Sequence, residues 1–308
     1  MSILFLLQQC VIGLTNGSLI ALVALGYTMV YGVLRFINFA HGDLIMLSAC
    51  LALSLVGPMG LVSTGQLPSL GTWIGIYALV IFCGLFCGLL SMVVDRLVYQ
   101  PLRNAPPLAP LVSAIGVSLI AMNIGLFWIG APDRSFPQPL PSENLLRFQE
   151  IQFTWNDLLV VLVVMPLIAL AMALIRLTRF GKALRAVSED RTAAALIGVD
   201  VNKVIRATFF LSGFLGGAAS VVTGLSANTI SYQMGFQTGF LAITASVLGG
   251  LGSLRGAVIG SFAVGLVGAL STAYVGERWA NAFVFIVLLI VLVFRPEGLL
   301  GQRAREVS

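Results

Sequence analysis

The chain has 308 residues, of which 58% are hydrophobic and only 9% are charged, and its mean hydropathy is +1.01. A typical soluble domain is roughly 25% charged, so this composition excludes a soluble globular fold, and the same values exclude intrinsic disorder. The net charge of +5 comes from basic residues spread through connecting segments, without the aromatic or repeat context of nucleic-acid binding. The composition therefore predicts an all-α, polytopic transmembrane helical bundle.

The predicted elements are membrane-spanning helices, each of which needs about 20 mostly apolar residues. Apolar runs of this order predict six spans, at residues 8–30, 72–94, 109–131, 156–175, 207–226 and 279–294. The run 43–57 is short, and the run 238–275 is long enough for two helices that turn at Gly252–Gly256. We therefore expect a single domain over residues 1–308 with about nine crossings, in a range of eight to ten, including broken or re-entrant helices.

Basic residues predict the orientation of the spans, because lysine and arginine accumulate on the cytoplasmic side. If the spans alternate strictly, twelve basic residues in the segments 95–107 and 176–206 and in the C-terminal tail fall on one side, against Arg134, Arg147 and Arg278 on the other. This asymmetry predicts an external N-terminus, a cytoplasmic C-terminus and a cytoplasmic loop at 176–206. Segment 132–155, which contains four prolines, is then an external loop with irregular, extended backbone.

A polar cluster separates the first two apolar runs and contains Arg35, Asn38, His41 and Asp43. An ionised side chain at the bilayer centre costs roughly 2.5–3.5 kcal/mol or more, so the cluster should lie in a surface loop or along a polar cavity. One interpretation is a short cytoplasmic turn in which Asp43 caps the next helix. The other is a direct role of Asn38, His41 and Asp43 along a pathway through the membrane.

The predicted cytoplasmic loop contains a short helix over residues 189–197. Ser188 is a suitable N-cap, Glu189 and Asp190 suit the first turn, and Gly198 suits the position after the last turn. Nine residues span about 13 Å, which is too short to cross the membrane. Such a helix could bind a soluble partner or lie on lipid headgroups, and the physical properties of its residues favour neither alternative.

The sequence lacks the usual signatures of an enzyme. Its single histidine has no serine nucleophile motif, and the stretch 180–183 lacks the glycine spacing and the Ser or Thr of a phosphate-binding loop. One histidine and four scattered cysteines give no zinc pattern, so we expect no catalytic residues, no metal and no cofactor. The predicted spans are nearly free of ionisable residues, which disfavours an ion-coupled carrier and indicates that another subunit supplies energy for transport.

Four motifs resemble the branched-chain amino acid ABC permease family, over about residues 10 to 301. They are Gly26-Tyr-Thr-Met-Val-Tyr-Gly32 followed by Ile37-Asn-Phe-Ala-His-Gly-Asp43, the loop Glu189–Gly198, the glycine-rich stretch Val247–Gly260, and the closing Pro296–Gly301. The resemblance implies an importer of the bacterial inner membrane. In such an importer two permeases, the second expected to be a different homologous chain, pair with two ATP-binding subunits that use ATP, and a periplasmic solute-binding protein delivers the cargo.

The resemblance also assigns roles to residues and classes of cargo. It implies that the loop couples to the ATPase subunits through Glu189, Asp190, Ala193, Ala194, Leu196 and Gly198. The loop would act as a lever that rotates the spans 156–175 and 207–226. Branched-chain or other neutral amino acids are the expected cargo, with urea or short amides as the alternative within the same family. A secondary carrier and a structural or receptor subunit are the rival classes. Asn16 and Tyr27 are weaker pathway candidates, for which span packing is the preferred explanation.

Overall fold

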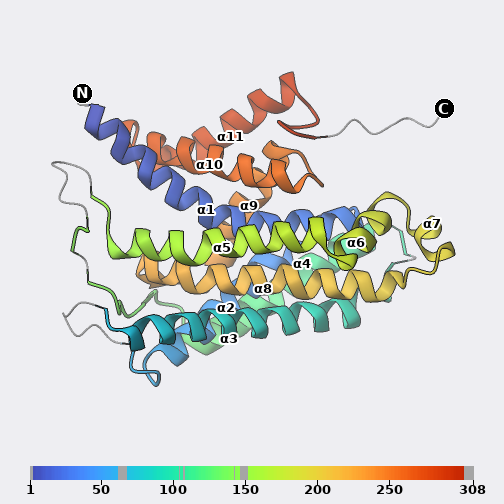
Figure 1. Ribbon diagram of the computed structural model, residues 1–308, viewed down its shortest axis with the longest axis horizontal. Helices are drawn as coiled ribbons and strands as arrows, with labels where there is room; N and C mark the ends of the chain where they lie inside the picture. Colours follow the sequence, from blue (N-terminus) through green and yellow to red (C-terminus); the bar gives the residue numbers. More distant parts are fainter. Residues whose placement is uncertain are drawn as a thin grey trace.

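The computed structural model describes residues 3–61, 68–103, 105–106, 108–141, 143–145 and 152–301. Within these ranges the chain forms eleven α-helices, one π-helical segment and one two-stranded sheet (Figure 1). The elements are α1 (Ile3–Leu34), α2 (Ala40–Val56), α3 (Leu70–Val94), η1 (Asp95–Tyr99), α4 (Leu108–Ile129), β1 (Arg134–Ser135), α5 (Trp155–Leu177), α6 (Arg179–Glu189), α7 (Arg191–Leu196), α8 (Val201–Ala227), β2 (Thr229–Ile230), α9 (Met234–Gly249), α10 (Leu254–Tyr274) and α11 (Glu277–Phe294).

The helices confirm the predicted membrane bundle. Among the described residues, seven helices are long and apolar enough to cross a membrane, and α2 and α9 are shorter apolar helices. These nine helices correspond to the nine predicted apolar segments. The predicted break within 238–275 is also present, because α9 ends and α10 begins around Gly250 and Gly252, whose φ angles of +106° and +87° suit glycine.

Helix α1 contacts α5, α6, α8, α9 and α10, and it packs most closely against α10. A Cβ atom placed on Gly265 of α10 would lie 2.5 Å from the backbone of Gly17, and one placed on Gly17 would lie 2.9 Å from Cα of Phe262. Side chains larger than hydrogen are therefore excluded at the crossing, as expected where small residues let membrane helices approach closely. This packing fixes α10 along the first half of α1.

Helices α2 and α9 both begin inside the bundle. The hydroxyl of Tyr27, in α1, accepts a hydrogen bond of 3.2 Å from the backbone N–H of Gly42, in the first turn of α2. Because α1 continues for seven more residues to Leu34, the start of α2 is recessed by about 10 Å from the end of α1. A Cβ atom on Gly235, in the first turn of α9, would lie 2.8 Å from the carbonyl oxygen of Gly42. The two short helices therefore meet at their N-termini, in agreement with the expectation of broken helices.

The predicted irregular segment 132–155 lies at the end of the bundle where α1 begins. Here β1 pairs antiparallel with β2, and Phe136 and Leu140 are buried. The side chain of Gln8 exchanges two hydrogen bonds, of 3.2 and 2.8 Å, with the backbone of Gln152. The backbone is mostly irregular, as expected, although residues 142 and 146–151 fall outside the described ranges.

Candidate coupling surface and transport cavities

Residues 178–200 form two short helices at the end of the bundle opposite the start of α1 (Figure 1). The hydroxyl of Thr178 accepts a hydrogen bond from the N–H of Gly181 and caps α6, which continues through Ser188 to Glu189. Asp190 then has an extended backbone, and its carboxylate accepts hydrogen bonds from the N–H groups of Thr192 and Ala193, at 2.7 and 3.0 Å. Asp190 is therefore the N-cap of α7.

The expected single helix 189–197 with Ser188 as its N-cap is wrong. The hydroxyl of Ser188 donates to the carbonyl oxygen of Arg185 instead, within the last turn of α6. Glu189 ends α6 rather than starting α7. The predicted role of Gly198 at the end of the helix is correct, because Gly198 follows α7 with a φ of +88°.

The α7 surface, which we define as Ala193, Leu196, Ile197 and Gly198, presents apolar groups outward. Leu196 is 85% exposed and Ile197 is 76% exposed. Ala194 instead faces inward and is buried, and the carboxylate of Asp190 is occupied by the helix cap. Of the six predicted coupling residues, Ala194 is buried, and Glu189, Asp190, Ala193, Leu196 and Gly198 are exposed. Asp190, as the N-cap, and Ala194, by its packing, hold the helix in place.

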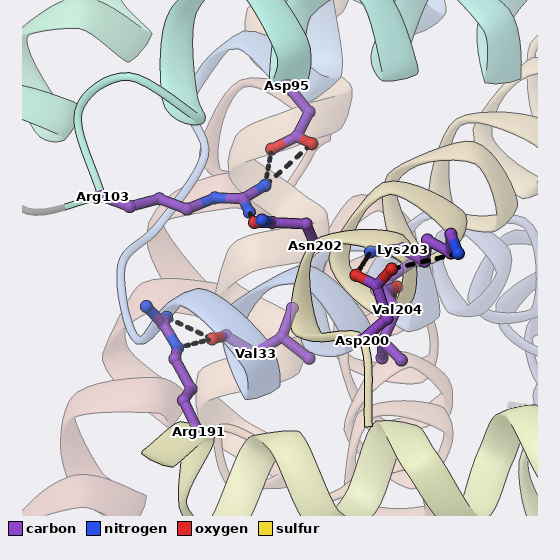
Figure 2. A network of polar contacts seen from close by, with 9 residues as sticks. Val33, Asp95, Arg103, Arg191, Asp200, Asn202, Lys203 and Val204 are labelled. Atoms are coloured by element: carbon purple, nitrogen blue, oxygen red, sulfur yellow. Dashed lines mark hydrogen bonds and ion pairs between the residues drawn. The ribbon is translucent and has the colours of Figure 1, made fainter. Parts of the chain in front are cut away.

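A buried ion pair supports α8, the helix that follows α7. Arg103 donates two hydrogen bonds, of 2.8 and 2.9 Å, to the carboxylate of Asp95 in η1. The other arm of its guanidinium donates to the side chain of Asn202 in the first turn of α8, so that Arg103 lies between Asp95 and Asn202 (Figure 2). Asp95 is fully buried and Arg103 is 12% exposed. This network ties the start of α8 to the end of α3.

Asp200 caps the N-terminus of α8. Its carboxylate accepts a hydrogen bond of 3.0 Å from the backbone N–H of Lys203 and forms an ion pair with the Lys203 side chain (Figure 2). The hydrogen bond from the backbone of Lys203 is the main reason that the pKa of Asp200 lies below its ordinary value. Asp200 therefore sets where α8 begins after the α7 surface.

A large cavity lies along the first half of α1, and we call it the N-terminal cavity. Its volume is about 760 Å³, and α1, α9, α10 and α11 form most of its walls. Amide and hydroxyl side chains line it together with one carboxylate: Gln9, Asn16, Thr223, Gln237, Thr238, Thr272, Asn281 and Glu277. Apolar side chains complete the lining, among them Ile12, Leu19, Leu241 and Val284. The cavity can accommodate a small molecule that has both polar and apolar parts.

A second cavity of about 570 Å³ lies at the other end of α1, and we call it the α7-end cavity. Its lining includes Val33 near the end of α1, Ser188 of α6 and three arginines, Arg176, Arg185 and Arg255. Residues 21–27 of α1 border neither of the two cavities, and this stretch of α1 is buried against its neighbours. The two cavities are therefore separated along α1 by a packed layer.

The predicted pathway residues lie near the start of α2, outside both of these cavities. The side-chain oxygen of Asn38 accepts hydrogen bonds from the hydroxyl of Tyr99, at 2.6 Å, and from the N–H of Ala40. His41 is buried and packs edge-on against the ring of Tyr27, with 4.7 Å between ring centroids. These contacts place Asn38 and His41 in the helix packing around the start of α2.

Asp43 does not cap α2, contrary to one of the two interpretations of the sequence. The N-cap position is Phe39, without a side-chain cap, and the carboxylate of Asp43 accepts a hydrogen bond from the hydroxyl of Ser118 in α4. Asp43 borders a smaller cavity of about 350 Å³ between α2, α4 and α9. Asn38 and His41 do not line this cavity.

Most of the polar lining of the N-terminal cavity was not identified from the sequence, which singled out only Asn16. A signal was present, because Gln9 and Asn16 are seven residues apart and so share one face of α1. The same spacing rule does not predict that Gln237 of α9 and Asn281 of α11 line the same cavity as Gln9 and Asn16.

The sequence is similar to those of known membrane permeases. Residues 9–292 match the family model described as the permease component of the branched-chain amino acid transport system. The high-affinity branched-chain amino acid transport system permease protein LivH of Escherichia coli (strain K12) is 33% identical over 305 residues, covering 97% of this chain and 96% of that protein. Salmonella typhimurium LivH is 32% identical over 303 residues, covering 97% of this chain and 96% of the relative. BraD of Pseudomonas aeruginosa, which has the same descriptive name, is 34% identical over 302 residues, covering 96% of each. No solved structure is significantly similar to the chain.

Proposed function

Because the chain belongs to the branched-chain amino acid transport permease family, we propose that it is the membrane-spanning permease subunit of an ABC importer. It provides one part of the pathway by which branched-chain or other neutral amino acids cross the bacterial inner membrane. Separate ATP-binding subunits supply the energy, and this chain binds no cofactor and catalyses no reaction itself. Within the described residues, no group of three His, Cys, Asp or Glu side chains could hold a metal ion.

The exposed α7 surface is the observation that carries this proposal. Helices α6 and α7 form a short hairpin that projects from one end of the bundle (Figure 1). Leu196 and Ile197 are exposed at the C-terminal end of α7. Two such side chains exposed beside charged residues suit a groove on a soluble protein better than solvent. We propose that Glu189, Ala193, Leu196 and Gly198 contact an ATP-binding subunit directly, and that Asp190 and Ala194 position them.

The proposed orientation follows from the basic residues and the helix directions together. The segment 176–206 is the most basic part of the chain, and this supports a cytoplasmic position for the α7 surface. The start of α1 and the N-terminal cavity lie at the opposite end, and we propose that they face the periplasm. A periplasmic solute-binding protein would then release cargo at the N-terminal cavity.

The lining of the N-terminal cavity supports a neutral amino acid as cargo. Amide groups such as those of Gln9, Asn16 and Asn281 can bind an ammonium and a carboxylate group, and Glu277 favours the ammonium. Apolar neighbours such as Leu241 can pack against an aliphatic side chain. Urea has no apolar part, so this mixed lining favours an amino acid over urea.

Helix α11 supports a partner on the open side of the N-terminal cavity. Val284 is its one buried residue, and Ile286, Leu289, Ile290, Val293 and Phe294 are exposed. Since α11 also lines the cavity, we propose that a second permease, a different homologous chain, completes the pathway beside it. Lipid covers the remaining apolar surface.

The predicted pathway role of Asn38, His41 and Asp43 remains a proposal. Its support is limited to Asp43, whose carboxylate borders the smaller cavity and is held by Ser118. We expect Asp43→Asn to lower the rate of uptake while the protein still folds, because asparagine keeps the size and an acceptor for the Ser118 hydroxyl. Unchanged uptake in this variant would remove Asp43 from the pathway.

Uptake of radiolabelled leucine tests the proposed function. The chain is expressed with its second permease, its ATP-binding subunits and its binding protein in a bacterial strain that lacks other branched-chain uptake. We expect saturable leucine uptake that isoleucine and valine inhibit and that urea does not. Transport of urea without leucine would identify a urea permease, and ionophore-sensitive uptake without the ATP-binding subunits would identify a secondary carrier.

A further inference from the structure

Two arginines link α1 to the α6–α7 hairpin in a reciprocal arrangement. Arg191, the first residue of α7, donates from Nε, at 2.9 Å, and from Nη2 to the carbonyl oxygen of Val33 (Figure 2). Arg35, directly after α1, donates from Nη2 to the carbonyl oxygen of Ser188 in the last turn of α6, at 2.5 Å. Each arginine therefore binds the C-terminal end of the helix that precedes the other.

The chemistry of both contacts is favourable and directional. The last carbonyl groups of a helix have no partner within the helix, and the negative end of the helix dipole attracts a cation. Hydrogen bonds from a guanidinium are also stronger than those between neutral groups. The two helix ends are therefore joined by charged hydrogen bonds in addition to packing.

The backbone of Arg35 is arranged for this contact. Its φ angle is +61°, and Arg35 is one of two non-glycine residues with a positive φ among the described residues. A side chain rarely adopts this conformation without a compensating interaction. Burial is the main reason that the pKa of Arg191 lies below its ordinary value, and the positive charges of Arg103 and then Arg35 lower it further. Three arginines therefore gather here despite their mutual repulsion.

The contacts bear on transport because of where α1 lies. Helix α1 contributes to the walls of both the N-terminal cavity and the α7-end cavity, and the two acceptor residues, Val33 and Ser188, both line the α7-end cavity. The start of α8 is instead tied to η1 through Arg103 and Asp95. The hairpin also continues into α8 and packs against α5 and α8, so the two arginine contacts give α1 a separate link to the hairpin.

We propose that Arg35 and Arg191 form a clamp through which movement of the α6–α7 hairpin shifts α1 and so changes access to the two cavities. Both are positioning residues that contact neither cargo nor nucleotide. The inference rests on the proposed function, because it requires an ATP-binding subunit that moves the hairpin. It differs from the expectation that α5 and α8 transmit this movement.

The clamp is tested with the complete transporter in proteoliposomes that contain leucine-loaded binding protein. The variants are Arg35→Ala, Arg191→Ala, the double variant and Arg191→Lys, which keeps the charge but loses the two-pronged contact with Val33. Arg179→Ala is the matched control, because Arg179 is an exposed arginine at the other end of α6. We measure leucine molecules transported per ATP hydrolysed, and the amount of ATP-binding subunit that copurifies with the permease.

A second measurement needs no cargo. Asn16→Cys, in the N-terminal cavity, is labelled with a membrane-impermeant maleimide in a Cys10→Ser background, since Cys50, Cys83 and Cys87 are buried. Labelling rates are compared without nucleotide and with ATP plus vanadate. An intact clamp should give a nucleotide-dependent change in rate of severalfold, and the clamp variants should show no such change.

We expect each single alanine variant to lower leucine per ATP at least tenfold, with normal copurification of the ATP-binding subunits. The double variant should be no worse than either single variant, because the two arginines act as one unit. Arg191→Lys should also be impaired, and Arg179→Ala should match the wild type. Coupling within twofold of the wild type in the double variant would overturn the clamp, as would loss of the ATP-binding subunits from the complex. If wild-type protein shows nucleotide-dependent labelling that the clamp variants lose, but no leucine uptake, the proposed cargo fails while the clamp stands.

Discussion

The α7 surface offers the prediction with the clearest magnitude. In the variant Leu196→Ala/Ile197→Ala, each substitution removes three carbon groups from side chains that are 85% and 76% exposed in the isolated chain. At about 0.8 kcal/mol for each CH₂ group buried on binding, scaled by these exposed fractions, the pair should lose about 4 kcal/mol of binding free energy if an ATP-binding subunit covers both. That loss corresponds to roughly a 700-fold weaker affinity.

The assay is binding of the purified permease, in nanodiscs, to its ATP-binding subunits. Alanine preserves the helix, and the substituted side chains have little packing within the chain, so thermal stability of the permease should be unchanged. Leu97→Ala is the control, because Leu97 is 70% exposed in η1 at the same end of the bundle. Affinity within threefold of the wild type for the double variant, or an equal loss for Leu97→Ala, would refute the assignment of the α7 surface.

Three further predictions concern the elements around this surface. Arg103→Ala should destabilise the protein by about 3–5 kcal/mol, because it leaves the buried carboxylate of Asp95 without its partner. Denaturation by SDS in mixed micelles measures this, and a smaller loss in Arg103→Met/Asp95→Leu is expected. Gly265→Val should prevent folding, since its Cβ atom would lie 2.5 Å from the backbone of α1; a normal yield of monodisperse protein would contradict the α1–α10 crossing. Because the pKa of Asp200 is lowered by folding, its stabilisation of α8 should be complete above an unfolded pKa of about 3.8 and lost as the pH falls through the lower folded-state pKa. A lower protection factor of the Lys203 amide below pH 3.8, measured against the intrinsic exchange rate at each pH, tests this, and a protection factor independent of pH would contradict it.

The apolar runs predicted the membrane-spanning helices because a lipid environment requires long, continuous helices. The turn between α9 and α10 was predictable for a similar reason. Gly250 and Gly252 mark a point where the backbone leaves the helical conformation, and few residues other than glycine allow the positive φ found there. Elements determined by local composition could therefore be read from the sequence.

The break between α6 and α7 could not be placed from the sequence, because its position depends on tertiary contacts. Ser188 and Asp190 are both good N-caps, and nothing local decides between them. In the folded chain the carbonyl oxygen of Ser188 accepts a hydrogen bond from Arg35, which stabilises α6 through this residue. The helix then ends at Glu189, and Asp190 begins the next one.

The cavities were missed for a related reason. The helix faces that carry Gln9 and Asn16 could be predicted, but the neighbours of those faces are set by packing between distant segments, such as Gly17 against Gly265. A pathway role was predicted for the polar cluster before α2 because charged groups are rare in such a chain. Two of its members, Asn38 and His41, are instead buried in helix packing.

The central claim is that this chain is a conduit that depends on an external source of energy acting on the α7 surface. The most direct measurement is leucine accumulation in proteoliposomes that contain both permeases and leucine-loaded binding protein, with and without the ATP-binding subunits. The account predicts accumulation only when those subunits and ATP are present, and its loss in Leu196→Ala/Ile197→Ala. Equal accumulation in vesicles that lack the ATP-binding subunits would contradict it.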